Sequence, residues 1–131
     1  KQLFKIAEEN GCNKIALGHH KDDAIETLLM NQIYQGTFST MPPKLVMKNY
    51  NVTIIRPLIL LREQEIIELS NEHNYKKQVK NCPYEKESKR DEIKVLIKTL
   101  EKMNPNVTSS IYNSMTNIQS EYLPNKIEET K

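Results

Sequence analysis

The chain has 131 residues, with 19 Lys and Arg against 17 Asp and Glu, so its net charge of +2 neither requires nor excludes a nucleic-acid partner. This length suits one domain with a single hydrophobic core. No apolar run approaches the roughly 18 to 20 residues that cross a bilayer, and the first residues are unlike a signal peptide. We therefore expect a cytoplasmic protein without membrane contact, whose two cysteines, Cys12 and Cys82, are free thiols or ligands rather than a disulfide.

The first third of the chain has the order helix, strand, helix. Residues 2–10 have apolar positions at helical spacing, and residues 14–18 form a short apolar run that predicts a buried strand. Asp22 and Asp23 then open a second helix, which Gly36 ends. The inward stripe of that helix is Ile25, Leu28, Leu29 and Ile33. This order predicts an α/β fold with a parallel sheet, in which ligands bind at the C-terminal ends of the strands.

The rest of the chain adds one strand and several helices. We expect irregular structure over residues 37–50, a strand over 52–58 that a proline closes, and helices over 62–73, 88–103 and 107–118. The predicted inward positions of the first of these helices are Ile66, Ile67 and Leu69. We divide the chain into an α/β part over residues 1–75, a cysteine-containing loop with C-terminal helices over 76–123, and a disordered tail over 124–131.

The segment from Gly18 to Thr27 reads GHHKDDAIET and holds two imidazoles, three carboxylates and a hydroxyl. Asp22 and Glu26 are four residues apart and share one helix face, as do Asp23 and Thr27. One interpretation is that the two aspartates only cap the helix, because its dipole favours carboxylates there. A metal site made by this segment alone is disfavoured, since adjacent histidines point in different directions.

Four stretches together resemble a known family. The GHHxDDxxET segment resembles the second motif of the PP-loop ATPases, which have an adenine-nucleotide alpha-hydrolase-like, Rossmann-like fold. The runs Met-Pro-Pro-Lys-Leu at 41–45, Ile-Arg-Pro-Leu at 55–58 and Asn-Cys-Pro at 81–83 follow in the order and spacing of the tRNA 2-thiocytidine synthetases. The resemblance implies an enzyme that uses ATP and Mg²⁺ to adenylate a tRNA base, after which sulfur displaces AMP.

Two features of that family have no match in these 131 residues, namely the phosphate-binding SGGxDS loop and a CxxC pair. We therefore expect the chain to be the C-terminal part of such an enzyme and to be inactive by itself. The resemblance implies catalytic roles for Asp22 and Asp23. The implied nucleotide and base pocket consists of Gly18, His19, His20, Glu26 and Thr27. Cys82 matches a ligand of a [4Fe–4S] cluster, whereas we interpret Cys12 as a packing residue.

Basic residues are candidates for contact with tRNA, because neutralised phosphates supply most non-specific RNA affinity. The expected RNA-binding residues are Lys44, Arg56, Lys86, Lys89 and Arg90. The expected partners are tRNA and a sulfur donor such as a cysteine desulfurase, with a homodimer as one candidate assembly. Two alternatives stay open at this point: a related PP-loop enzyme that makes 2-thiouridine or a lysidine-type product, and a non-catalytic RNA-binding or partner-binding module.

Overall fold

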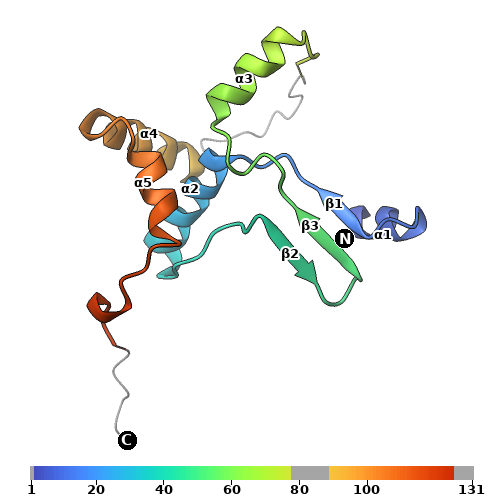
Figure 1. Ribbon diagram of the computed structural model, residues 1–131, viewed down its shortest axis with the longest axis horizontal. Coiled ribbons are helices and arrows are strands. Elements are labelled where there is room, and N and C mark those ends of the chain that lie inside the picture. The colour runs from blue at the N-terminus through green and yellow to red at the C-terminus, as the bar shows by residue number, and fades with distance from the viewer. Residues whose placement is uncertain (1, 78–88, 126–131) are drawn as a thin grey trace, which may run out of the picture.

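The computed structural model describes residues 2–77 and 89–125. Within them the α/β class predicted from the sequence is confirmed. Figure 1 shows a small sheet with one helix beside it, and a separate group of helices formed by α2, α4 and α5. The elements are α1 (Gln2–Glu9), β1 (Lys14–Ala16), α2 (Lys21–Met30), the π-helix η1 (Asn31–Gln35), β2 (Lys44–Met47), β3 (Val52–Ile55), α3 (Glu63–Glu72), α4 (Lys89–Met103), α5 (Val107–Ser114) and the 3₁₀-helix η2 (Ser120–Tyr122).

The sheet has the strand order β1-β3-β2. β1 and β3 are parallel, with Ile15 opposite Ile54, which confirms the parallel pair expected from the helix–strand–helix order. β2 is antiparallel to β3, with Leu45 opposite Ile54. The expectation of irregular structure over residues 37–50 is therefore wrong for β2. This strand forms because Asn51, at a φ of 50°, closes a tight turn that returns the chain to β3.

The strands differ in burial. Central β3 buries Val52 and Ile54, and α1 contacts the same strand. β1 is more open, because Lys14 and Ala16 are exposed and only Ile15 is partly covered. The prediction of a buried strand is wrong here for a simple reason: among the described residues β1 pairs on one side only.

The main apolar cluster lies between α2, α4 and α5. Ile25, Ile93 and Ile97 are buried at its centre. Leu28 is also buried, whereas Ile33, which was expected on the same stripe, is 53% exposed. The cause is the change from α-helix to π-helix at Asn31, since the wider turn shifts the side-chain positions. The predicted stop at Gly36 is confirmed, with this residue in the left-handed conformation at a φ of 62°.

Helix α3 projects away from the other helices (Figure 1). None of its residues is buried, and Ile67 and Leu69 are 44% and 46% exposed. Their predicted inward orientation is therefore wrong, because only the start of α3 is held against the rest of the described chain. In residues 2–77 and 89–125 no helix has the length and apolarity that crossing a membrane requires.

Candidate functional site

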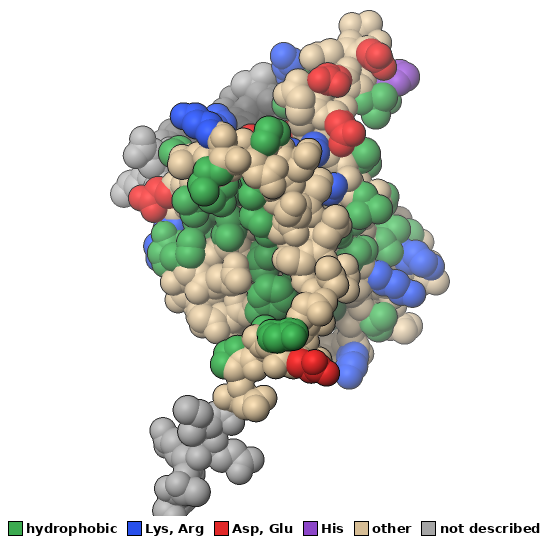
Figure 2. All heavy atoms as spheres, turned by 60° about the vertical axis from the view of Figure 1, so that its left-hand side comes forward, with side chains coloured by type: hydrophobic (Ala, Val, Ile, Leu, Met, Phe, Trp, Pro, Cys, Tyr) green, Lys and Arg blue, Asp and Glu red, His purple; other side chains and the backbone are tan. Residues whose placement is uncertain are grey.

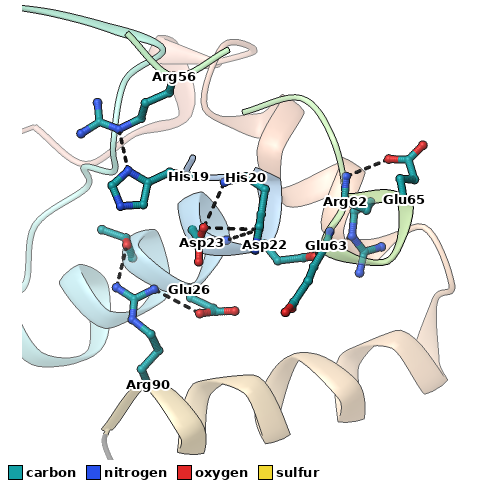
Figure 3. Close-up of polar contacts among 11 residues, drawn as sticks. His19, His20, Asp22, Asp23, Glu26, Arg56, Arg62, Glu63, Glu65 and Arg90 are labelled. Atoms are coloured by element: carbon teal, nitrogen blue, oxygen red, sulfur yellow. Dashed lines mark hydrogen bonds and ion pairs between the residues drawn. The ribbon is translucent and has the colours of Figure 1, made fainter. Parts of the chain in front are cut away.

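The GHHKDDAIET segment begins shortly after β1 and runs into the first turns of α2. Figure 3 shows its two histidines and its carboxylates together at the start of α2. The N–H group of Leu17 donates to Ile55 and so extends the β1–β3 ladder up to this segment. The N–H group of Lys21 donates to the carbonyl of Leu61, which follows β3, at 2.8 Å. The segment thus lies at the C-terminal end of the parallel strands, where a ligand site was expected.

Asp23 and His20 cap α2 together. The N–H of Asp23 donates to Nδ1 of His20 at 3.3 Å, and the N–H of His20 donates to Oδ2 of Asp23 at 3.0 Å. These reciprocal bonds form a capping box, so the capping interpretation holds for Asp23. Nδ1 of His20 also lies 3.4 Å from Oδ2 of Asp23, but we assign it as an acceptor because the direction of the backbone N–H is fixed.

Asp22 has a different role from its neighbour. Its side chain points to the start of α3, where Oδ1 accepts from Nε of Arg62 and Oδ2 accepts from the N–H of Glu63, both at 2.7 Å. Arg62 also donates to Glu101 of α4 at 2.9 Å. Burial opposes the charge of Arg62, but its bonds to Asp22 and Glu101 outweigh that effect and raise the pKa of Arg62. Asp22 therefore caps α3 instead of α2.

Glu26 lies one turn further along α2 and is 3% exposed. Its Oε1 accepts from Arg90 of α4 at 3.1 Å, and the same guanidinium donates to Oγ1 of Thr27 at 3.1 Å. Burial raises the pKa of Glu26 above its usual value, although Arg90 and Lys94 act in the opposite direction. Figure 3 shows Arg90 reaching Glu26 from the start of α4.

Asp22 and Glu26 border one cavity of about 360 Å³. The shared helix face predicted from their spacing is therefore confirmed. The other lining residues come from the start of α3 and from α4, and they are Arg62, Glu63, Gln64, Ile67, Lys94, Ile97, Lys98 and Glu101. Charges of both signs surround this space, and the ion pair between Asp22 and Arg62 has both of its partners in the lining.

Arg56 follows β3 directly and is only 8% exposed. Its Nε donates to Nδ1 of His19 at 3.2 Å, and its NH1 donates to the carbonyl of Pro42 at 2.7 Å. A buried guanidinium with these partners is poorly placed to reach an RNA phosphate. The expected RNA contact of Arg56 is therefore disfavoured, and the geometry ties this residue to the candidate site instead.

The other expected RNA-binding residues divide into three groups. Lys44 is exposed on β2, and Lys89 is exposed with Nζ 4.5 Å from the ring centroid of Tyr34. Arg90 is engaged with α2, as described above. Lys86 lies outside the described residues. On the face shown in Figure 2, the described residues form several groups of apolar side chains, and their Lys and Arg side chains are scattered instead of forming one continuous basic surface.

The described residues fit the expected cofactors unequally. Asp23 is 25% exposed at its side chain, and Oδ1 accepts no hydrogen bond from a described residue, so it suits a Mg²⁺ ion, which commonly takes one or two carboxylates beside phosphates. A Cβ at Gly18 would meet nothing within 4 Å, so no close phosphate cradle is shown there. No group of three or more His, Cys, Asp or Glu in the described ranges is placed to hold a metal.

The cysteines do not assemble a cluster site within the described ranges. Cys12 is free and exposed, so its interpretation as a packing residue is wrong. It precedes β1, at the opposite end of the strand from His19. Cys82, the expected cluster ligand, lies outside the described residues. A [4Fe–4S] cluster ordinarily needs several thiolates, so these residues alone do not fit one.

A family described as PP-loop domain matches residues 1–100. The chain belongs to this family. It is 40% identical over 123 residues to a tRNA-cytidine(32) 2-sulfurtransferase of Geobacter metallireducens, covering 92% of the chain and 48% of the relative. It is also 40% identical over 125 residues to a tRNA-cytidine(32) 2-sulfurtransferase 1 of Francisella tularensis subsp. holarctica, covering 95% and 50%. The chain therefore spans about half the length of the curated relatives it matches.

A solved structure supports the same fold. The U34-tRNA thiolase NcsA from Methanococcus maripaludis, determined with its [4Fe–4S] cluster, matches with a TM-score of 0.69 and 25% identity. The match covers 97% of this PP-loop chain and 43% of the thiolase. Both comparisons lead to proteins that are named as tRNA thiolation enzymes.

Proposed function

We propose that this PP-loop chain is part of an ATP-dependent enzyme that thiolates cytidine in tRNA. The observation that carries the proposal is the 40% identity to tRNA-cytidine(32) 2-sulfurtransferases over 92% of the chain. The geometry agrees, because the GHHKDDAIET segment lies where a parallel sheet places its ligands. Such an enzyme works in the cytoplasm on tRNA, with sulfur supplied by a donor such as a cysteine desulfurase.

Within this proposal the two aspartates have separate tasks. Mg²⁺ would neutralise negative charge on a phosphate, and Asp23 is the residue suited to hold it, through its open oxygen. Both oxygens of Asp22 already accept short hydrogen bonds, so the role we propose for Asp22 is to hold the start of α3. The catalytic role expected for Asp22 from the sequence stays a prediction. Glu26 and Thr27 hold α4 through Arg90. The described residues form no close phosphate cradle at Gly18 and no group of ligands that would hold a [4Fe–4S] cluster.

The RNA surface is proposed from the basic residues that remain exposed. Lys44 and Lys89 meet that condition among the described residues. Phosphate contacts position an RNA without reading its sequence, so they would orient the substrate and leave base choice to the pocket.

The test is thiolation by the complete gene product that contains this chain. The protein would be incubated with a tRNA transcript, ATP, Mg²⁺ and sulfide. The tRNA would then be digested to nucleosides, and these would be identified by mass spectrometry. We expect 2-thiocytidine, and none from a matched transcript with uridine in place of the target cytidine. The specific rival is uridine thiolation, which the NcsA likeness favours. Formation of 2-thiouridine alone would replace our proposal with that rival.

A further inference from the structure

Arg56 and His19 meet because the strands that precede them are parallel. β1 and β3 run side by side with Ala16 opposite Ile55, so the residues that follow them emerge at the same edge of the sheet. Arg56 is held there on two sides. Its backbone N–H donates to the carbonyl of Pro43 at 2.8 Å, and its NH1 donates to Pro42 at 2.7 Å. Its Nε is thereby aimed at the ring of His19 (Figure 3).

The hydrogen bond between them has only one possible direction. A guanidinium donates and never accepts, so Nδ1 of His19 must be the acceptor at 3.2 Å. A neutral imidazole that accepts at Nδ1 has its proton on Nε2. His20 is in the same state, because its Nδ1 accepts from the N–H of Asp23. The two adjacent histidines therefore present N–H groups, not lone pairs, at their Nε2 atoms.

We propose that Arg56 is a positioning residue that keeps His19 in the Nε2–H tautomer, so that His19 donates a hydrogen bond to an oxygen acceptor of the substrate. Two substrate oxygens have this chemistry, a phosphate oxygen of the nucleotide and the carbonyl oxygen of the target base. The tautomer follows from the geometry of Arg56 alone. The acceptor rests on the proposed function, and the two parts are tested by separate measurements.

The tautomer would be measured by ¹⁵N NMR of the complete gene product labelled at histidine, at a pH about two units above the ordinary imidazole pKa. A His19→Gln spectrum identifies the two ring signals by their loss. We expect one protonated nitrogen, Nε2, and one unprotonated nitrogen, Nδ1. In Arg56→Met the ratio of the tautomers should fall by about tenfold, because a charge-assisted bond to Nδ1 is lost. Lys5→Met, which removes an exposed charge from α1, should change neither signal.

A protonated Nδ1 in the unmodified protein would overturn the proposal, as would unchanged ring signals in Arg56→Met. If Arg56→Met fails to fold, Arg56→Lys replaces it, because lysine keeps the charge and a donor for Pro42 but not the second bond to His19. The same ratio should then fall, and an unchanged ratio again refutes the role of Arg56.

The acceptor would be identified by adding ATP with Mg²⁺ or tRNA to the labelled protein. A change at Nε2 of His19 with the nucleotide alone indicates a phosphate oxygen, and a change with tRNA alone indicates the base. No change with either ligand would refute the donor role. In thiolation assays, Arg56→Met should lower kcat about tenfold and leave KM for tRNA within about twofold. His19→Gln keeps a side-chain N–H and should retain more activity than His19→Ala, whereas equal loss would contradict donation.

These measurements separate the two proposals. If the unmodified protein forms no thionucleoside, the proposed function fails, but the ring signals still decide whether Arg56 controls the tautomer. If thiolation occurs and the ring signals are insensitive to Arg56, only the present inference fails.

Discussion

The ion pair between Glu26 and Arg90 joins side chains with very different exposure, 3% for Glu26 and 37% for Arg90. Removing Arg90 leaves a buried carboxylate without its partner, whereas replacing Glu26 leaves a guanidinium that already reaches water. Breaking a buried pair is costly mainly because of the charge that stays behind. We therefore expect Arg90→Met to destabilise the protein at pH 7 more than Glu26→Gln does.

The loss of stability in Arg90→Met has an upper limit, because the Glu26 carboxylate that has lost its partner can bind a proton and become neutral. The usual pKa of Glu26 is 4.5, so protonating it at pH 7 costs at most about 3.4 kcal/mol at about 1.36 kcal/mol per pH unit. Loss of the bond from Arg90 to Thr27 adds about 1 kcal/mol. Glu26→Gln keeps the shape of the side chain and an oxygen acceptor for Arg90, so we expect a change of about 1 kcal/mol or less.

The sign of the pH dependence follows from the direction of the shift. Burial raises the pKa of Glu26, so the folded protein binds this proton more readily than the unfolded chain does. The ionised carboxylate therefore costs stability above its folded pKa, and that cost disappears as the pH falls toward 4.5. Without Arg90 the pKa rises further. The loss caused by Arg90→Met should therefore shrink by about 1.36 kcal/mol per pH unit as the pH falls from the folded pKa of Glu26 in the variant toward that in the unmodified protein.

Urea unfolding, followed by circular dichroism at pH 5 to 8, measures both effects. Lys98→Met is the matched control, because Lys98 is exposed on the same helix and forms no ion pair with another described residue. It should change the free energy of unfolding by less than about 0.5 kcal/mol. Equal losses for Arg90→Met and Glu26→Gln, or a loss for Arg90→Met that does not vary with pH, would refute the reasoning from burial.

Three further predictions use the same protein. Asp22→Asn should lower the free energy of unfolding by about 1–3 kcal/mol, because both oxygens of Asp22 accept hydrogen bonds from the start of α3. Asp23→Asn should cost less stability but abolish pyrophosphate release. Cys82→Ala should remove cluster absorbance and thiolation together, and Cys12→Ala should retain both. Iron and sulfide analysis of each variant measures the cluster, and a fully loaded, active Cys82→Ala protein would contradict the ligand assignment. Gly36→Ala should cost about 1 kcal/mol in urea unfolding, because Gly36 ends its helix at a φ of 62°.

The features that the sequence predicted correctly follow from local residue patterns and from the order of the elements along the chain. Gly36 stops its helix through a conformation that its own lack of a side chain permits. Ile25 is buried in the main apolar cluster because it sits on the predicted apolar stripe of its helix. The parallel strand pair followed from the order of elements along the chain, and this order also placed the candidate site at the correct end of the sheet.

The features that were missed depend on pairing and packing partners that the sequence pattern does not show. β2 was hidden because two prolines precede it and its pairing is set by the turn at Asn51. Ile67 has helical periodicity with its neighbours, but periodicity does not show whether anything packs against the stripe. The bond from Arg62 to Asp22 spans 40 residues, and no local pattern marks Arg62 as the partner.

The spacing of the three carboxylates in GHHKDDAIET nevertheless predicted which of them share neighbours, which their residue types alone do not. Residues four apart share a helix face, so Asp22 and Glu26 had to face the same neighbours while Asp23 faced elsewhere. The structure shows that these neighbours are the starts of α3 and α4, each held by an arginine. Asp23 is left with an oxygen that accepts no bond from a described residue. A motif can thus identify a family while the partners of each side chain decide which of its carboxylates is available for chemistry.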